Sequence, residues 1–388
     1  MFGRSLPSIA VFASKNWRKM TSENAILKIF LCGDVMLARG IDQIQRQSCP
    51  PQLHESFVKD ARIYVQLAEE KNGAVTQPVD SSYVWGAALS EFEQQQPDLK
   101  LINLETAVTL CDDFCPKGIN YRMHPKNIGI LSSAKINGCV LGNNHVLDWG
   151  RTGLSETLDT LHKAEIKFAG AGKDKVEASK PMLFNFPGKG RVLVFSYGMP
   201  SSGVVPGWEA TSTSSGVNIL KDLSHLSVEM IRDRIQAVKQ PNDIVILSVH
   251  WGGNWGYKIS QEEINFAHSL IDDAGVDVVH GHSSHHPKCI EVYKHKLILY
   301  GCGDFINDYE GISGHDQFRG ELSLMYFVTL SFRTGNLLRL DLTPTQMKKL
   351  QVQFASSQDA QWLVNLLNRE SRNAKFSLSS GRIHLQTQ

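Results

Sequence analysis

The chain alternates short apolar runs with longer stretches in which apolar and charged positions recur at helical spacing. Apolar runs that are rich in β-branched residues and bounded by glycine predict buried strands. Such runs lie at residues 26–32, 99–104, 137–142, 245–250 and 276–280. The helical spacing is clearest where Leu154, Leu158 and Leu161 form one apolar stripe. Strands that alternate with helices in this way predict an α/β fold.

Later in the chain, predicted strands come in pairs joined by turn residues, which indicates hairpins and therefore a layered fold with a mixed sheet. The pairs are 181–186 with 191–197, 289–293 with 297–300, and 322–332 with 337–342. No linker requires a second domain. We expect a flexible extension at residues 1–24, one α/β domain at 25–345, and a C-terminal helix with a loose tail at 346–388.

Polar side chains follow the carboxyl ends of five of the predicted strands. They are Asp34, Glu105, Asn144 with His145, His250, and His282 with His285. Ligands of α/β sheets bind outside the carboxyl ends of the strands, so these side chains converge at one edge if their strands share a sheet. Imidazole suits zinc and iron, and carboxylate or amide oxygen also suits manganese and magnesium. The pattern therefore predicts a solvent-accessible catalytic centre with one or two divalent cations.

Each of these motifs also has a purely structural explanation. Asp34 could cap a helix, Asn144 and His145 could form a turn, and residues 280–286 could be a polar loop. Arg122 lies in a stretch that we expect to be extended, and its guanidinium matches phosphate or carboxylate oxygens, which makes it a candidate contact for a substrate anion. A surface arginine without a function explains Arg122 equally well.

Composition narrows the function classes further. The 388 residues carry a net charge of +1 and no basic tract interleaved with aromatic residues, which argues against nucleic-acid binding. No apolar run approaches the roughly 18 residues that are needed to span a membrane. Seven cysteines without a metal-binding spacing favour reduced thiols and a cytoplasmic protein. The basic start of the chain, with no acid before Glu23, could instead be an organelle-targeting peptide.

Taken together, the strand-end motifs resemble those of the CapA/PgsA-type capsule (poly-γ-glutamate) synthesis proteins, a family related to the calcineurin-like metallophosphoesterases. The resemblance covers about residues 27–330 and implies a four-layer α/β/β/α sandwich with mixed sheets. The motifs that carry it are Gly33-Asp34, Asn103-Leu-Glu105, Asn143-Asn144-His145 with Asp148, His250-Trp-Gly252, Gly281-His282-Ser-Ser-His285, and residues 300–308.

The resemblance also implies roles for individual residues. The expected metal ligands are Asp34, Glu105, Asn144, His250, His282 and His285, with Glu105 at the position of a bridging acid. His145 would be the general acid beside the metal, and we group Asp148 and Arg122 with it as catalytic residues. Manganese, zinc, iron and magnesium remain open as the cation.

This sequence departs from the pattern of the related families at several positions. Met36 stands where related phosphoesterases have a metal-binding histidine. Asn254 replaces a glutamate, and Asp304 replaces an asparagine. Two serines separate His282 from His285 where the family has His-Pro. These changes could weaken one metal position, retune the ligand set or abolish activity.

Three functions follow from these observations. The leading hypothesis is a metal-dependent hydrolase that uses a metal-activated water on a phosphoester or phosphoanhydride, with an anionic small molecule or a polyanion as substrate. The second is an accessory protein of poly-γ-glutamate or capsule polysaccharide synthesis that acts on the polyanion or binds it. The third is a non-catalytic protein with a decayed site, which the residues at Met36 and Asn254 would favour.

Overall fold

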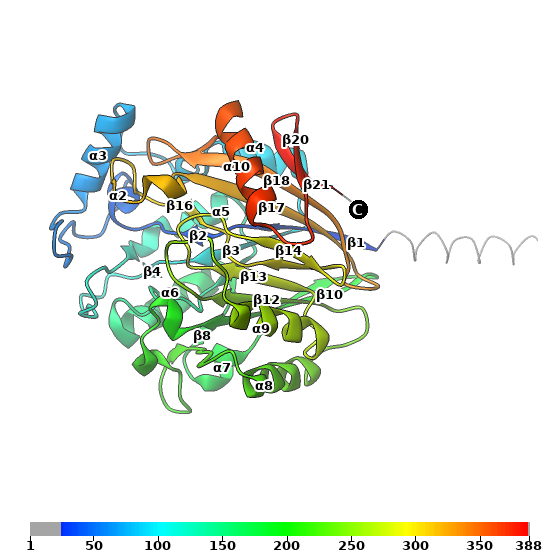
Figure 1. Cartoon of the computed structure of the whole chain (residues 1–388). Coiled ribbons are helices and arrows are strands. Elements are labelled where there is room, and N and C mark those ends of the chain that lie inside the picture. The colour runs from blue at the N-terminus through cyan, green and yellow to red at the C-terminus, as the bar shows by residue number, and fades with distance from the viewer. Residues whose placement is uncertain (1–24, 387–388) are drawn as a thin grey trace, which may run out of the picture.

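Two mixed β-sheets packed face to face form the centre of the molecule, and helices lie on their outer faces (Figure 1). The computed structural model describes residues 25–386, so the expected extension at 1–24 lies outside the described residues. The predicted α/β class with mixed sheets is confirmed. Among residues 25–386, no helix combines the length and the apolar character needed to cross a bilayer.

The larger sheet has eleven strands and is mixed, because β1 pairs in parallel with β3 and antiparallel with β17. Its main order is β16-β2-β3-β1-β17-β18-β21-β20, with β6, β7 and β19 attached beside this path. The strands are β1 (Ile26–Leu31), β2 (Asp34–Val35), β3 (Leu99–Leu104), β6 (Gly138–Val140), β7 (Lys167–Ala169), β16 (Asp304–Ile306), β17 (Leu322–Ser331), β18 (Leu337–Met347), β19 (Val352–Phe354), β20 (Phe376–Ser379) and β21 (Arg382–Leu385).

The smaller sheet has six strands in the order β14-β15-β13-β12-β10-β9. Its four central strands are parallel, and the edge strands β9 and β14 pair antiparallel with their neighbours. The strands are β9 (Met182–Phe186), β10 (Gly190–Gly198), β12 (Ile244–His250), β13 (Val278–His282), β14 (Ile290–Tyr293) and β15 (Lys296–Leu299). All three predicted hairpins are therefore confirmed, two here and one between β17 and β18 of the larger sheet.

Alternating apolar positions on the strands bury both faces of each sheet. Residues such as Ile29 and Leu101 of the larger sheet meet Val194 and Ile246 of the smaller one in the central core. On the outer faces, helices α4 (Ala87–Gln95), α5 (Gly129–Ser133) and α6 (Gly150–Lys163) cover the larger sheet, and α8 (His225–Gln236) and α9 (Gln261–Asp272) cover the smaller one. The remaining helices are α2 (Arg39–Gln43), α3 (Arg62–Asn72), α7 (Lys175–Ser179) and α10 (Ser357–Glu370).

The C-terminal segment is ordered, so the expectation of a loose tail is wrong. After α10, strands β20 and β21 form a hairpin that joins the larger sheet through β18. Phe376 and Ile383 are buried against α10 in the central core. This burial stabilises two short strands whose apolar alternation is weak in the sequence.

Candidate metal centre

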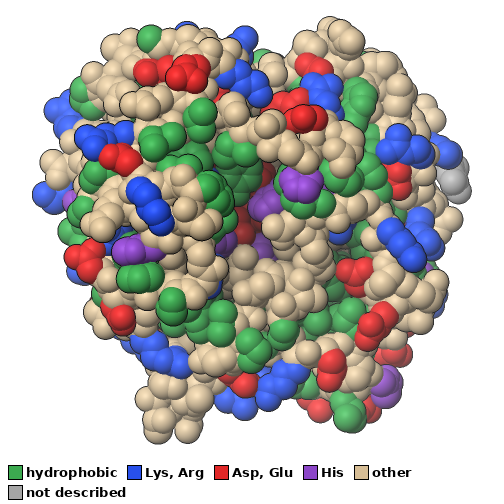
Figure 2. All heavy atoms as spheres, turned by 60° about the vertical axis from the view of Figure 1, so that its left-hand side comes forward, with side chains coloured by type: hydrophobic (Ala, Val, Ile, Leu, Met, Phe, Trp, Pro, Cys, Tyr) green, Lys and Arg blue, Asp and Glu red, His purple; other side chains and the backbone are tan. Residues whose placement is uncertain are grey.

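The predicted donors lie together, but they come from two sheets rather than from one. In the larger sheet, β2 supplies Asp34, and the segments after β3 and β6 supply Glu105 and Asn144. In the smaller sheet, the ends of β12 and β13 supply His250 and His282. The expected convergence did not require one shared sheet, because the carboxyl ends of strands from both sheets face the same hollow. Acidic and histidine side chains lie at the base of this hollow, and hydrophobic side chains border it (Figure 2).

Strand register places the donors beside one another. In the larger sheet, Asp34 is paired with Asn103 on β3 and with Asp304 on β16. In the smaller sheet, His250 of β12 is paired with His282 of β13. Adjacent strands are about 4.8 Å apart, so paired residues at the ends of strands can share one ligand.

A chain of hydrogen bonds fixes the tautomer of His282. Burial lowers the pKa of His280 to about 4 and that of His282 well below its ordinary value, so both rings are neutral at neutral pH. His280 Nε2 lies 2.7 Å from the carbonyl of Cys32 and must donate to it, which leaves His280 Nδ1 to accept from the Ser248 hydroxyl at 3.1 Å. The Ser248 oxygen then accepts from His282 Nε2 at 2.8 Å. His282 Nδ1 therefore carries a lone pair.

His250 reaches the same state through different neighbours. Burial is the largest cause that lowers its pKa well below the ordinary value. Its Nε2 faces two acceptors, Asn144 Oδ1 at 3.0 Å and Glu105 Oε1 at 3.5 Å, so this nitrogen carries the proton. The Nδ1 lone pair of His250 consequently points at that of His282 over 2.7 Å, and Asp34 Oδ1 lies 4.0 Å and 3.9 Å from the two nitrogens. Facing lone pairs repel unless a proton or a cation lies between them, so these three residues fit a cation.

A second donor set uses Asp34 together with Glu105 and Asp304. All three carboxylates are buried. Burial raises the pKa of Asp34 to about 8, with a further contribution from the charge of Asp304, and burial likewise raises the pKa of Glu105 well above its usual range. Buried acids this close together stay ionised only beside a cation, so this set also fits a divalent ion.

His285 contacts the second set rather than the first. Its Nδ1 lies 3.0 Å and 3.1 Å from the two carboxylate oxygens of Asp304. Burial opposes protonation of this ring, but the Asp304 carboxylate raises the pKa of His285 above its ordinary value. His285 therefore acts on the cluster through Asp304 in this structure.

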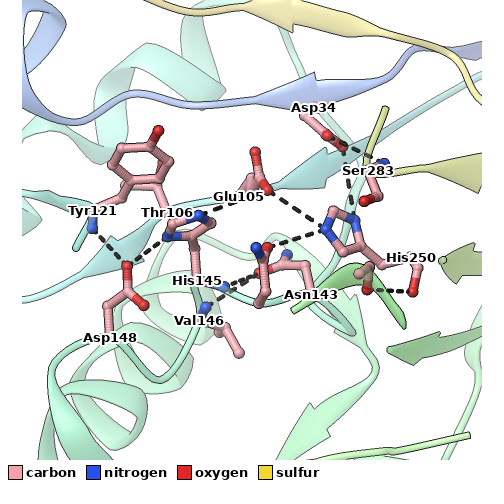
Figure 3. A network of polar contacts seen from close by, with 12 residues as sticks. Asp34, Glu105, Thr106, Tyr121, Asn143, His145, Val146, Asp148, His250 and Ser283 are labelled. Atoms are coloured by element: carbon pink, nitrogen blue, oxygen red, sulfur yellow. Dashed lines mark hydrogen bonds and ion pairs between the residues drawn. The ribbon is translucent and has the colours of Figure 1, made fainter. Parts of the chain in front are cut away.

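His145 is held at the edge of the centre by Asp148, which in turn binds the backbone of Tyr121 (Figure 3). Its Nδ1 lies 2.6 Å from Asp148 Oδ2, and its Nε2 lies 4.0 Å from Glu105 Oε1. Lys117 Nζ binds Asp148 Oδ1 at 2.9 Å, and the backbone N–H of Tyr121 donates to Asp148 Oδ2 at 2.6 Å. The Tyr121 ring stacks on His145 with 4.0 Å between centroids. Burial lowers the pKa of His145 to about 4, so the ring is neutral at neutral pH.

Arg122 lies apart from these donors. Its guanidinium donates to Asp112 Oδ1 at 2.7 Å and to the Cys111 carbonyl at 2.9 Å, and it stacks on Trp149. These contacts are all to the irregular segment after residue 108 and to the start of α6, so no described contact joins Arg122 to the centre.

Two residues of the site were not among the predicted ligands or catalytic residues, although Asp304 was noted as a departure that could retune the ligand set. Asp304 had a signal, because Gly303-Asp304 repeats the Gly33-Asp34 pattern at the end of a strand-like run. Lys117 had none, because it belongs to an irregular insertion with no periodic pattern. Met36, which stands where a metal-binding histidine was considered, instead accepts a hydrogen bond from the Ala38 N–H at 3.1 Å.

Comparison with known proteins identifies the family. The family model described as bacterial capsule synthesis protein PGA_cap matches residues 28–309. This chain belongs to the PGA_cap family. The expected resemblance to CapA-type capsule synthesis proteins is thus confirmed, and the matched region of this PGA_cap protein contains both donor sets.

Individual relatives agree with this assignment. A probable polyglutamine synthesis accessory protein from Mycobacterium tuberculosis is 44% identical over 355 residues, which cover 91% of this PGA_cap chain and 93% of the relative. The PGA biosynthesis protein CapA of Bacillus subtilis is 26% identical over 301 residues, with coverage of 76% and 74%. The capsule biosynthesis protein CapA of Bacillus anthracis is 28% identical over 202 residues, with coverage of 49% and 46%.

Proposed function

We propose that this PGA_cap protein is a metal-dependent hydrolase of phosphoesters or phosphoanhydrides, built on a four-layer sandwich of the calcineurin-like metallophosphoesterase type. The observation that carries the proposal is the pair of facing imidazole lone pairs of His250 and His282, which converge on the Asp34 carboxylate. Among residues 25–386, no lysine or arginine forms an ion pair with Asp34, Glu105 or Asp304, so their charge is left for a ligand.

Asp34 belongs to both donor sets and could join two cations. His250 and His282 would complete one position, and Glu105 and Asp304 would complete the other. A bound divalent cation would supply Lewis acidity and a hydroxide at neutral pH by lowering the pKa of water. Mixed nitrogen and oxygen donors suit manganese, zinc or iron at the first position, and oxygen donors alone suit manganese or magnesium at the second.

His145 and Asp148 would deliver the proton that the leaving oxygen needs. Asp148 accepts from His145 Nδ1, so a second proton goes to Nε2, which faces Glu105 and the centre. An anionic substrate beside His145 favours that charged form, which then protonates the leaving oxygen. Lys117 and the Tyr121 N–H hold Asp148 in place.

The test combines metal content with turnover. Purified full-length protein is analysed for bound metal and assayed on a panel of phosphoesters with added Mn²⁺, Zn²⁺, Fe²⁺ or Mg²⁺. His250→Ala and Asp34→Ala should lose metal and turnover together. His268→Ala is the matched control, because that imidazole stacks on Tyr293 on the outer face of the smaller sheet and should change neither. Equal turnover in chelator would refute the proposal.

A second candidate is an accessory role in polymer synthesis, in which the centre acts on a polyanion or only binds it. It is favoured by the name of the Mycobacterium tuberculosis relative, a probable polyglutamine synthesis accessory protein whose match covers 91% of this chain. Tight binding of poly-γ-glutamate in calorimetry, without turnover of any phosphoester, would select this candidate. A protein that holds no stoichiometric metal and neither binds nor cleaves would instead have a decayed site.

A further inference from the structure

A pocket of about 380 Å³ opens beside the proposed centre and shares two walls with it. Tyr121 lines the pocket and stacks on His145, with ring centroids 4.0 Å apart. His285 also lines the pocket and contacts Asp304 at 3.0 Å. A group attached to the oxygen that His145 protonates would therefore extend past Tyr121 into this pocket.

Aromatic and aliphatic side chains form much of the lining, and polar and charged side chains form the rest. The apolar ones include Phe57, Tyr64, Tyr121, Trp255, Tyr309 and Ile312. The hydroxyls of Tyr121 and Tyr309 lie 2.8 Å apart and satisfy each other, so they place few free polar groups on the wall. Phe57 and Ile312 are exposed apolar side chains, 72% and 45% accessible, at the rim. Hydrophobic side chains bordering the hollow are visible in Figure 2.

The charged groups of this pocket are largely committed to partners in the chain. The Arg39 guanidinium binds Glu55 and Asp308. Glu310 accepts from the backbone N–H groups of Lys349 at 2.7 Å and Leu350 at 2.6 Å.

Among the other charged side chains of the lining, Glu321 pairs with Arg319 at 2.5 Å. Lys71 and Asp316 carry opposite charges and contribute no net charge to the wall. The wall thus lacks the excess of basic side chains that a polyanion requires.

We propose that this pocket binds an uncharged aromatic leaving group of a phosphoester. The inference rests on the proposed function, since it assigns the substrate class of the same centre. In the reaction, a water oxygen bonds to phosphorus and gives up a proton to solvent, the bond from phosphorus to the leaving oxygen breaks, and His145 supplies a proton to that oxygen and regains one from solvent. The products are an aromatic alcohol and inorganic phosphate.

The first test compares three phosphate monoesters on the Mn²⁺-loaded full chain. Benzyl phosphate and ethyl phosphate have alcohol leaving groups of similar reactivity, so their kcat/KM ratio reports the contact of the ring with the pocket. Burying a phenyl ring predicts a ratio of at least about tenfold in favour of benzyl phosphate. The anionic 4-carboxybenzyl phosphate should be poorer than benzyl phosphate by about tenfold, because its carboxylate loses hydration without gaining a partner.

Substitutions at the rim test whether the preference for benzyl phosphate over ethyl phosphate depends on this pocket. Phe57→Ala and Ile312→Ala should each lower the benzyl-to-ethyl ratio by about threefold or more, because each removes apolar surface from the ring's contact. Leu226→Ala is the matched control, since this leucine is 74% accessible and lies on α8, which covers the outer face of the smaller sheet. The control should leave the ratio unchanged. A ratio near one in the active wild type, or a ratio that neither rim variant alters, would overturn the inference.

A binding measurement separates this inference from the proposed function. Benzylphosphonate and ethylphosphonate cannot be cleaved at the P–C bond, and calorimetry gives their affinities for the Mn²⁺-loaded chain without turnover. Tighter binding of benzylphosphonate that Phe57→Ala weakens would support the pocket even where no ester is hydrolysed, in which case only the hydrolase proposal fails. Equal binding of the two phosphonates, or preferential binding of the 4-carboxy derivative, would overturn the pocket assignment.

Discussion

Two groups of buried acids in this molecule differ in how their charge is balanced. In the first, Glu55 and Asp308 share the guanidinium of Arg39, which binds Glu55 at 2.9 Å and Asp308 through two nitrogens and stacks on Tyr64. In the second, the polar contacts that Asp34, Glu105 and Asp304 make within residues 25–386 are with histidines and with amide or backbone N–H donors.

Both groups are at most 4% accessible, so burial alone does not distinguish them. The difference is that Arg39 supplies a cation to the first set, whereas no lysine or arginine among residues 25–386 pairs with the second, which we propose is balanced by a cation from solution.

The largest expected loss of unfolding free energy comes from removing the Arg39 guanidinium, which balances Glu55 and Asp308. Arg39→Met leaves Glu55 and Asp308 buried without a counter-charge, and breaking such a network costs about 3–5 kcal/mol. Urea unfolding should show this loss with the slope unchanged. Arg62→Ala is the control, since the exposed Arg62–Asp60 pair should leave the midpoint where it is. A small change for Arg39→Met would mean that the first group is not held by its own cation.

Adding a divalent cation should give the next largest change in the free energy of unfolding, and it should act through Asp34, Glu105 and Asp304. A divalent ion that binds the folded state raises the free energy of unfolding by about 2.7 kcal/mol at 100 times its dissociation constant. Asp34→Asn should lose most of this increase, while Asp277→Asn, which alters a buried acid already paired with Lys296, should keep it. Equal stabilisation of all three proteins by Mn²⁺ would place the cation elsewhere.

Removing Lys117 should change the free energy of unfolding by an intermediate amount, because its ammonium balances the charge of Asp148 at the edge of the centre. Lys117→Met leaves Asp148 Oδ1 buried without its 2.9 Å partner, which should cost about 1–2 kcal/mol of unfolding free energy. The exposed pair of Lys173 with Asp159 supplies the control variant, Lys173→Met, for which we expect no shift of the midpoint. Stability equal to wild type for Lys117→Met would show that the charge on Asp148 Oδ1 does not depend on Lys117.

The smallest expected effect is a dependence of the free energy of unfolding on pH when a chelator keeps the protein free of metal. The pKa of Asp34 is about 8 in the folded chain and near its ordinary value of about 3.9 in the unfolded one, so between pH 7 and 8 the folded state binds more protons. Stability should therefore fall as pH rises through this window, by at most about 1.4 kcal/mol per pH unit for one proton.

The nearby histidines with lowered pKa do not affect this window. His250 and His282 are neutral in both states above pH 7 and lower the stability only below about pH 6.5. Thermal unfolding from pH 7 to 8 measures the slope, and Asp34→Asn should reduce it, while the raised pKa values of Glu105 and His285 supply the remaining fall. A wild-type midpoint that is constant in chelator would contradict the raised pKa of this uncompensated acid.

Much of the fold follows from local patterns in the sequence. Apolar runs such as 245–250 became β12, and the leucine stripe of 153–163 became α6. The C-terminal hairpin was not predicted, because Phe376 and Ile383 are held by contacts with α10 and β18 that no local pattern encodes.

The candidate site was predictable only in part. The strand-end rule selected Asp34, Glu105, His250 and His282 correctly as neighbours, because a strand that ends at a hollow must present its last side chains there. It could not show that two sheets contribute, since sheet packing is a long-range property. It also could not separate Arg122 from Lys117, because both depend on how an irregular segment folds back on the chain.

The most direct test of the central claim is a crystal structure of the full chain grown with Mn²⁺, with anomalous scattering collected to locate the ion. We predict an anomalous peak about 2.0–2.3 Å from Nδ1 of both His250 and His282 and from a carboxylate oxygen of Asp34, with the two nitrogens moved apart to admit it. Crystals that contain Mn²⁺ but show no peak there, with the two Nδ1 atoms still 2.7 Å apart, would contradict the account.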